Sequence, residues 1–136
     1  MPIVTRLVMA LALVFAIALP ASADEAGIRA TITGQMEAFR AEDAEGAFSY
    51  AAPNIKGMFG SADRFGMMVR NGYPMVWNNV DVQYLELREL GGRLWQMVQV
   101  QDTDGGYHYL DYLMVETPDG WQIAAVQFLP APDIGV

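Results

Sequence analysis

The sequence predicts a single α+β domain in which N-terminal helices pack on a curved, mainly antiparallel sheet. Apolar residues recur at helical spacing as far as about residue 72, and from about residue 75 they alternate with polar residues, as in strands. The connections between the later segments are short, which makes consecutive strands antiparallel neighbours. A chain of 136 residues also has the length of one domain.

Residues 1–23 are expected to form an export signal rather than part of the fold. Arg6 supplies a positive charge, and an apolar run of 13 residues follows from Leu7 to Leu19. Signal sequences carry apolar runs of roughly 7 to 15 residues, whereas a membrane span needs roughly 20. The small residues Ala21-Ser22-Ala23 are typical of a signal peptidase site. We therefore expect cleavage near Ala23, a periplasmic or secreted domain at 24–136, and membrane contact only before cleavage; the alternative is an uncleaved anchor.

The expected mature domain is acidic. The whole chain has 16 acidic and 8 basic residues and a net charge of −8, and without Arg6 the balance is 16 against 7, or −9. With one lysine, Lys56, and no basic stripe, the charge pattern argues against nucleic-acid binding. The chain has no cysteine, which excludes disulfides and cysteine-ligated metals. Its stability must therefore come from buried apolar surface.

The first predicted helix extends from about Glu25 to Ala41. Its apolar stripe, at spacings of four, four and three, consists of Ile28, Ile32, Met36 and Phe39. A second, short helix is predicted from an N-cap at Asp43 to Pro53, which cannot continue it.

The helical half of the chain continues as far as Gly72. Asn54 is predicted to cap one further turn that ends at Gly60. Ser61 is the predicted N-cap of a longer helix that ends at Gly72, shortly before Pro74. We expect two or three helices to cover the sheet.

Five segments of the second half are predicted strands, and short turns connect them. The predicted strands are Met75 to Asn78, Asp81 to Leu90, Leu94 to Asp102, Tyr107 to Glu116 and Trp121 to Leu129. The predicted turns are Asn78-Asn79, Gly91-Gly92, Thr103 to Gly106 and Pro118 to Gly120. These segments predict a meander of long antiparallel strands.

Both faces of this sheet are expected to be largely apolar. In the strand from Tyr107, one face carries Tyr109, Leu113 and Val115, and the other carries Leu110, Tyr112 and Met114. A sheet covered by helices on one side alone should alternate more cleanly between apolar and polar residues. We expect a homodimer formed sheet against sheet. The alternatives are that the tail from Pro130 to Val136 covers the second face, or that its aromatic residues are half exposed.

Scattered residues along the chain resemble a known family. The segment Asp119-Gly120-Trp121-Gln122-Ile123, after helices and meandering strands, resembles the nuclear-transport-factor-2-like (SnoaL-like) superfamily of conical α+β domains. A narrower resemblance, to the bacterial domain-of-unknown-function family numbered 4864, is carried by Gln35, Ala38-Phe39, Asp43, Ala47-Phe48, Ala52-Pro53, Ile55, Met58-Phe59-Gly60, Phe65, Met68-Val69, Gly72-Tyr73, Gln99, Asp102, Gly105, Tyr112 and Met114.

The resemblance covers almost the whole chain after residue 23. It implies an exported protein with the conical fold, which in this superfamily commonly encloses a cavity. The family has no agreed activity. No position matches a catalytic motif of the superfamily's ketosteroid isomerases, dehydratases or polyketide cyclases, so no catalytic residue is carried over.

Asp111 and Tyr109 are the candidate catalytic residues. They share one face of the strand from Tyr107, and a carboxyl group beside a tyrosine in an apolar pocket can act as a proton donor or a base. If that face is directed outward, Asp111 is an ordinary surface carboxylate. The alternation of residues does not decide between the two orientations.

Metal binding and histidine chemistry find little support. His108 lies three residues from Asp111, so in a regular strand the two side chains point to opposite faces, and we interpret His108 as a structural or surface residue. Asp102 and Asp104 resemble the start of a calcium loop, but Leu113 stands where position 12 requires glutamate. We interpret this segment as a hairpin turn, and expect no metal and no cofactor.

An adaptable apolar pocket is the most favoured functional feature, because methionine and aromatic side chains fit varied ligands. The candidate ligand-binding residues are Phe39, Tyr50, Phe65, Met68, Tyr73, Trp95 and Met97. The alternative is that these residues are simply core. We expect a noncatalytic module that binds a small apolar ligand or a protein; the alternatives are an isomerase- or dehydratase-type enzyme using acid/base chemistry, and a structural module that works through its apolar sheet face.

Overall fold

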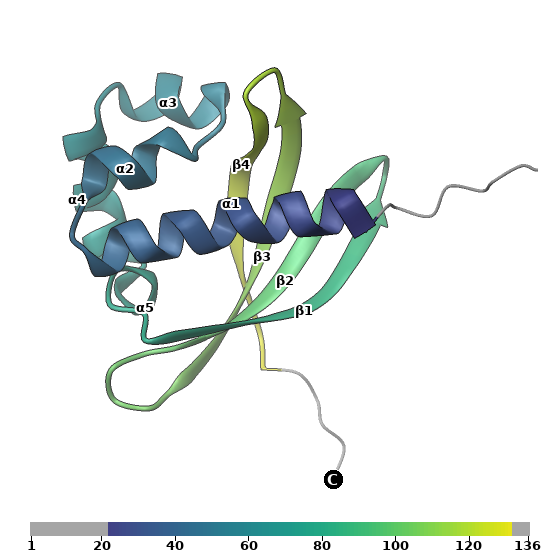
Figure 1. The fold of residues 1–136 in the computed structure, drawn as a ribbon. Helices are drawn as coiled ribbons and strands as arrows, with labels where there is room; N and C mark the ends of the chain where they lie inside the picture. The colour runs from purple at the N-terminus through teal and green to yellow at the C-terminus, as the bar shows by residue number, and fades with distance from the viewer. Residues whose placement is uncertain (1–21, 132–136) are drawn as a thin grey trace, which may run out of the picture.

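The structure, a computed structural model, describes residues 22–131. Within this range the helices precede the strands (Figure 1), which confirms the predicted α+β class. The elements are α1 (Ser22–Arg40), α2 (Ala44–Ser49), α3 (Pro53–Phe59), α4 (Ala62–Gly72), α5 (Pro74–Trp77), β1 (Asp81–Leu90), β2 (Arg93–Gln101), β3 (Tyr107–Thr117) and β4 (Gly120–Leu129). The predicted export signal lies outside the described residues except for its last two positions, where α1 begins. No helix in the described range is long and apolar enough to span a bilayer.

The four strands form one antiparallel meander in the order β1-β2-β3-β4. Figure 1 shows a strongly curved sheet with α1 crossing one of its faces, and α2, α3 and α4 gathered near the C-terminal end of α1. The bounds of the last four predicted strands agree with the structure to within one residue. Irregular pairing between Tyr84 and Leu87 in β1, and beside Leu113 and Met114 of β3, marks two bulges.

The predicted strand from Met75 to Asn78 is wrong, because Pro74–Trp77 forms the short helix α5. Pro74 is at its first position, which suits the fixed φ of proline. The carbonyl of Tyr73 accepts the N–H groups of Val76 and Trp77, and both side chains are buried. A short apolar run of this kind is compatible with either a strand or a buried helical turn.

Asn78-Asn79 is consequently not a hairpin turn. Asn79 is buried, and its Nδ2 donates to the carbonyls of Met36 (3.1 Å) and Val76 (2.7 Å). It thereby joins α5 to α1.

Helices α2 and α3 differ from prediction only at their boundaries. The capping roles of Asp43, Gly60 and Ser61 are confirmed, with Gly60 in the left-handed conformation at φ 78°. The second helix, however, ends at Ser49, and Pro53 begins α3 instead of ending α2. Proline is favoured at the first position of a helix, where its missing N–H costs nothing. Asn54 therefore lies inside α3 and does not cap it.

The core lies between α1 and the sheet face that carries Leu110, Tyr112 and Met114, which we call the inner face. The predicted stripe of α1, Ile28, Ile32, Met36 and Phe39, is at most 1% exposed. The opposite, outer face carries Tyr109, Asp111 and Leu113 of β3. The tail from Pro130 onward, predicted as a possible cover for this face, lies mostly outside the described residues.

Candidate functional site

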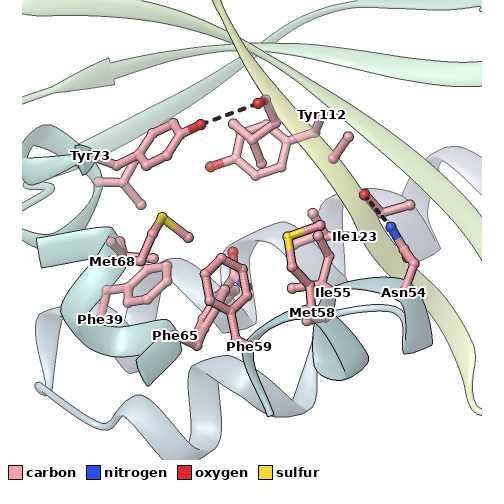
Figure 2. Close-up of a pocket in the computed structure, with 17 residues that line it drawn as sticks. Phe39, Asn54, Ile55, Met58, Phe59, Phe65, Met68, Tyr73, Tyr112 and Ile123 are labelled. Atoms are coloured by element: carbon pink, nitrogen blue, oxygen red, sulfur yellow. Dashed lines mark hydrogen bonds between the residues drawn. The ribbon is translucent and has the colours of Figure 1, made fainter. Parts of the chain in front are cut away.

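A cavity of about 330 Å³ lies between the helices and the inner face of the sheet. Figure 2 shows the 17 residues that line it. None of them has a charged side chain, and only Gln35, Asn54, Tyr73 and Tyr112 are polar. The cavity is therefore suited to an uncharged, mostly apolar molecule.

Aromatic and methionine side chains from α1 and α4 form one wall of the cavity. Phe39 of α1 stacks on Phe65 of α4 with a ring separation of 6.1 Å, and Met68 lies beside them (Figure 2). Phe65 also meets Phe59 edge to face at 5.8 Å, which connects this wall to α3. The facing wall is formed by β3 and β4, with Tyr112 and residues 123–126.

Helix α3 covers the cavity with Ile55, Met58 and Phe59. None of its residues is fully buried, and Met58 is 69% exposed. The segment before α3 is fixed to β4 by two backbone hydrogen bonds, from the N–H of Ala52 to the carbonyl of Ile123 and from the N–H of Ile123 to the carbonyl of Tyr50. This pairing holds α3 over the cavity.

Three of the four polar lining side chains donate to the backbone. Nδ2 of Asn54 donates to the carbonyl of Ala124 (2.9 Å), the hydroxyl of Tyr73 to that of Val126 (3.4 Å), and Nε2 of Gln35 to that of Ala47 (3.1 Å). The fourth, Tyr112, makes no side-chain hydrogen bond among the described residues. Burial raises the pKa of Tyr112 well above its usual value, so its hydroxyl stays protonated.

The structure brings four of the seven predicted ligand-binding residues together in the cavity wall: Phe39, Phe65, Met68 and Tyr73. The other three, Tyr50, Trp95 and Met97, do not line it. Tyr50 packs against α1 at Gly34, where a β-carbon would clash with the tyrosine ring. Trp95 and Met97 pair with Leu113 and Asp111 on the outer face.

The list of candidate ligand-binding residues omitted Tyr112, Gln35 and the cavity residues of α3. Gln35 was visible only as a polar residue next to the apolar stripe of α1. Ile55 and Met58 lie in a short helix, whose pattern does not separate a cavity position from a core position. Tyr112 shares the strand face of Leu110 and Met114, which are core residues, and alternation alone does not separate a core position from a cavity position.

Asp111 is on the outer face, away from the cavity. It accepts two hydrogen bonds from Arg88 of β1, from Nη1 to Oδ1 at 2.8 Å and from Nη2 to Oδ2 at 2.7 Å. Hydrogen bonding to Asp111 raises the pKa of Arg88. The hydroxyl of Tyr109 donates to Oε1 of Gln99 at 3.0 Å. The two candidate catalytic residues therefore have separate partners, and the orientation into a pocket that their proposed chemistry requires is not found.

The turn between β2 and β3 is organised by Asp102. Its Oδ1 accepts the backbone N–H groups of Asp104 (2.8 Å) and Gly106 (2.9 Å), and its Oδ2 lies 2.7 Å from Nε2 of His108. Among the residues that the structure describes, no cluster of three or more acidic or histidine side chains could hold a metal ion. The segment is a hairpin turn, as interpreted from the sequence, and His108 serves as a partner of that turn.

This turn predicts a pH dependence of stability. The hydrogen bond from His108, followed by that from Gly106, lowers the pKa of Asp102. A carboxylate with a lowered pKa stabilises the fold above its unfolded pKa of about 3.9, and this stabilisation is lost as the pH falls through the folded pKa. We expect Asp102→Asn to be less stable than the wild type at pH 6, with the difference disappearing as the pH falls through the lowered folded pKa of Asp102. Urea unfolding across pH 2.5 to 7 measures this, with Asp104→Asn in the same turn as the control; a difference that persists unchanged at low pH would contradict it.

Fold and cavity together define an α+β domain that holds an uncharged pocket between its helices and a curved sheet. The chain belongs to the family described as Domain of unknown function (DUF4864), whose sequence profile matches residues 21–136. This confirms the narrower of the two predicted resemblances.

Other comparisons add a structural likeness only. No curated protein matches the chain. Among solved structures, the chain is similar to a phospholipid-binding protein from Ralstonia solanacearum in complex with a phospholipid, with a TM-score of 0.47 and 13% identity, covering 77% of each chain. A likeness at this level carries no conclusion about function from that protein to this one.

Proposed function

We propose that this protein is an exported, noncatalytic binder of a small, largely apolar ligand. The observation that carries the proposal is the cavity of about 330 Å³ with 17 uncharged lining residues. Ligand pockets typically have volumes of about 300 to 1,000 Å³ and are lined by apolar and aromatic groups with few polar ones. The cavity agrees with that description in both size and lining.

The chemistry of the lining favours binding over catalysis. No aspartate, glutamate, histidine, lysine or arginine lines the cavity. General acid and base catalysis depends mainly on such side chains. An apolar ligand in this cavity is held by its own burial, which contributes about 0.8 kcal/mol for each methylene group removed from water.

The cover formed by α3 provides a route for the ligand. Met58 is exposed and also lines the cavity, so it stands at the boundary between the cavity and solvent. Methionine is flexible and polarizable, and it adapts to ligands of different shape. Entry beside Met58 leaves the sheet unchanged.

Three further features belong to the same proposal: cleavage near Ala23 during export, membership of the nuclear-transport-factor-2-like superfamily, and a homodimer formed through the outer face. The arrangement of helices over a curved antiparallel sheet supports membership of the superfamily.

The outer face is the proposed surface of the homodimer. Self-association of an acidic chain is easiest through a surface whose charges cancel, and on the outer face Arg88 neutralises Asp111. Trp95 and Met97, on the same face, are only partly buried.

We expect the purified protein to bind N-phenylnaphthylamine, an uncharged apolar fluorophore, with a dissociation constant on the order of 10 μM. Binding in an apolar cavity should increase its fluorescence and shift its emission to the blue. Titration of the protein into a fixed fluorophore concentration measures the affinity, and urea-unfolded protein is the control. Absence of saturable binding would contradict the proposed function.

Native mass spectrometry of protein purified from the bacterial envelope tests the remaining features. The proposal expects a mature chain that begins near residue 24, a dimer, and a retained small molecule. A monomer at micromolar concentration would contradict the proposed homodimer but not the proposed ligand binding. An intact N-terminus would contradict the proposed cleavage of the signal.

A further inference from the structure

Tyr112 places the one unused hydroxyl of the cavity wall at the centre of the sheet. The residue is 1% exposed, and it pairs with Gln96 of β2 and Val126 of β4. Its ring belongs to the core, whereas Figure 2 shows its hydroxyl directed into the cavity, on the side of Tyr73. Among residues 22–131, no group forms a hydrogen bond with this hydroxyl.

The neighbouring polar groups do not satisfy it. Tyr73 uses its own proton on the carbonyl of Val126, and the side-chain amides of Asn54 and Gln35 donate to backbone carbonyls. The hydroxyl keeps some accessible surface, so it is not a fully buried group without a partner, and it faces the cavity (Figure 2). A ligand in the cavity can therefore accept its hydrogen bond without displacing a partner within the protein.

The charge of the lining limits what that partner is. No cationic side chain lines the cavity, so a carboxylate or phosphate placed there would lose its hydration without an opposite charge in return. A neutral oxygen loses much less hydration and can be satisfied by one donor. The protonated hydroxyl of Tyr112 is such a donor.

We propose that the ligand is an uncharged apolar molecule with a single oxygen acceptor, such as a ketone or ester carbonyl, and that the hydroxyl of Tyr112 donates a hydrogen bond to that oxygen. This inference rests on the proposed function and adds the chemical class of the ligand. The apolar body of the ligand lies against Phe39, Phe65 and Met68, and its oxygen lies toward β3.

Three probes with one skeleton test the inference: ethylnaphthalene, acetylnaphthalene and naphthoate, each substituted at the same ring position. Isothermal titration calorimetry measures their affinities for the wild type and for Tyr112→Phe, which removes only the hydroxyl. We expect Tyr112→Phe to weaken the binding of acetylnaphthalene about fivefold, as for the loss of one neutral hydrogen bond. The affinity for ethylnaphthalene should stay within twofold of the wild-type value. We expect the wild type to bind naphthoate at least about tenfold more weakly than acetylnaphthalene.

Tyr109→Phe is the matched control, because it removes one hydroxyl from the outer face of the same strand. It should leave all three affinities unchanged. A second measurement needs no variant: the carbonyl stretching band of acetylnaphthalene bound to the wild type should move to lower wavenumber than in an alkane solvent, as expected for a carbonyl that accepts a hydrogen bond.

The outcomes separate the two proposals. If none of the three probes binds the wild type, the proposed function fails, and the inference fails with it. If ethylnaphthalene and acetylnaphthalene bind but Tyr112→Phe affects them equally, or the carbonyl band stays at its alkane position, the inference is overturned and ligand binding stands. Naphthoate binding as tight as that of acetylnaphthalene would overturn the uncharged class.

Discussion

Replacement of Arg88 by methionine is expected to lower the free energy of unfolding by about 3 kcal/mol. The guanidinium of Arg88 holds both oxygens of Asp111, at 2.8 and 2.7 Å. The side chain of Asp111 is 6% exposed, and that of Arg88 is 20% exposed. Removal of the arginine leaves a nearly buried carboxylate without its charge partner, and such losses cost about 3 to 5 kcal/mol. The partial exposure of Arg88 places the expected value at the lower end.

Urea unfolding of the wild type and the variant measures this loss. Arg93→Met is the matched control, since Arg93 is an exposed arginine at the start of β2; we expect it to change stability by less than about 0.5 kcal/mol. The double variant Arg88→Met/Asp111→Leu should recover most of the loss, because apolar residues often replace a buried ion pair without cost. If Arg88→Met were as mild as Arg93→Met, the pair would contribute no more than a surface salt bridge.

Alternation could not predict Arg88 as the partner of Asp111. Tyr84 is on the inner face, where its hydroxyl donates to the carbonyl of Arg29 in α1, so a regular strand would place Arg88 on that face as well. The bulge between Tyr84 and Leu87 reverses the alternation, and Arg88 pairs with Trp95 on the outer face instead. No pattern in the sequence marks this bulge.

Long elements with a regular apolar pattern could be predicted from the sequence. A short element whose structure depends on tertiary contacts could not. The apolar pattern of α1 extends over several turns and that of the four long strands over many residues, so the type of each element followed from the sequence. The strand bounds agree to within one residue, whereas α1 begins at Ser22 and not near Glu25. The segment Pro74–Trp77 has only four residues, and its helical form depends on burial of Val76 and Trp77 and on the contacts of Asn79 with α1. These contacts lie 43 residues apart in the chain.

The sequence predicted which kinds of residue line the cavity, but only some of the particular residues. Aromatic and methionine residues of α1 and α4 could be assigned to it because helical spacing already directed them to the core. Trp95 and Met97 are also an aromatic and a methionine residue, but they lie on the outer face. Their assignment to the cavity was wrong because the orientation of a strand is known only once the face of one of its residues is known. The contribution of α3 depends on its fixation to β4 through Ala52 and Ile123, which no local pattern indicates.

Val126→Trp is expected to weaken binding of N-phenylnaphthylamine by at least about 30-fold, or about 2 kcal/mol. Val126 lines the cavity from β4 and shares the inner face with its partner Tyr112, and its side chain is only partly buried. An indole at this position occupies space that the ligand would otherwise fill. Because the added atoms enter an existing cavity and not a packed core, we expect the free energy of unfolding to change by less than about 1 kcal/mol, below the usual cost of overpacking.

Gln127→Trp provides the control for this prediction, because it makes a bulky aromatic substitution one residue later, at an exposed position that pairs with Asp111 on the outer face. Fluorophore titration should give the wild-type affinity for Gln127→Trp and almost no saturable binding for Val126→Trp, while urea unfolding shows that both variants are folded. If both variants bind equally well, the fluorophore occupies some other surface. If both lose binding, the loss does not depend on which face of β4 carries the indole, and the cavity is not shown to be the ligand site.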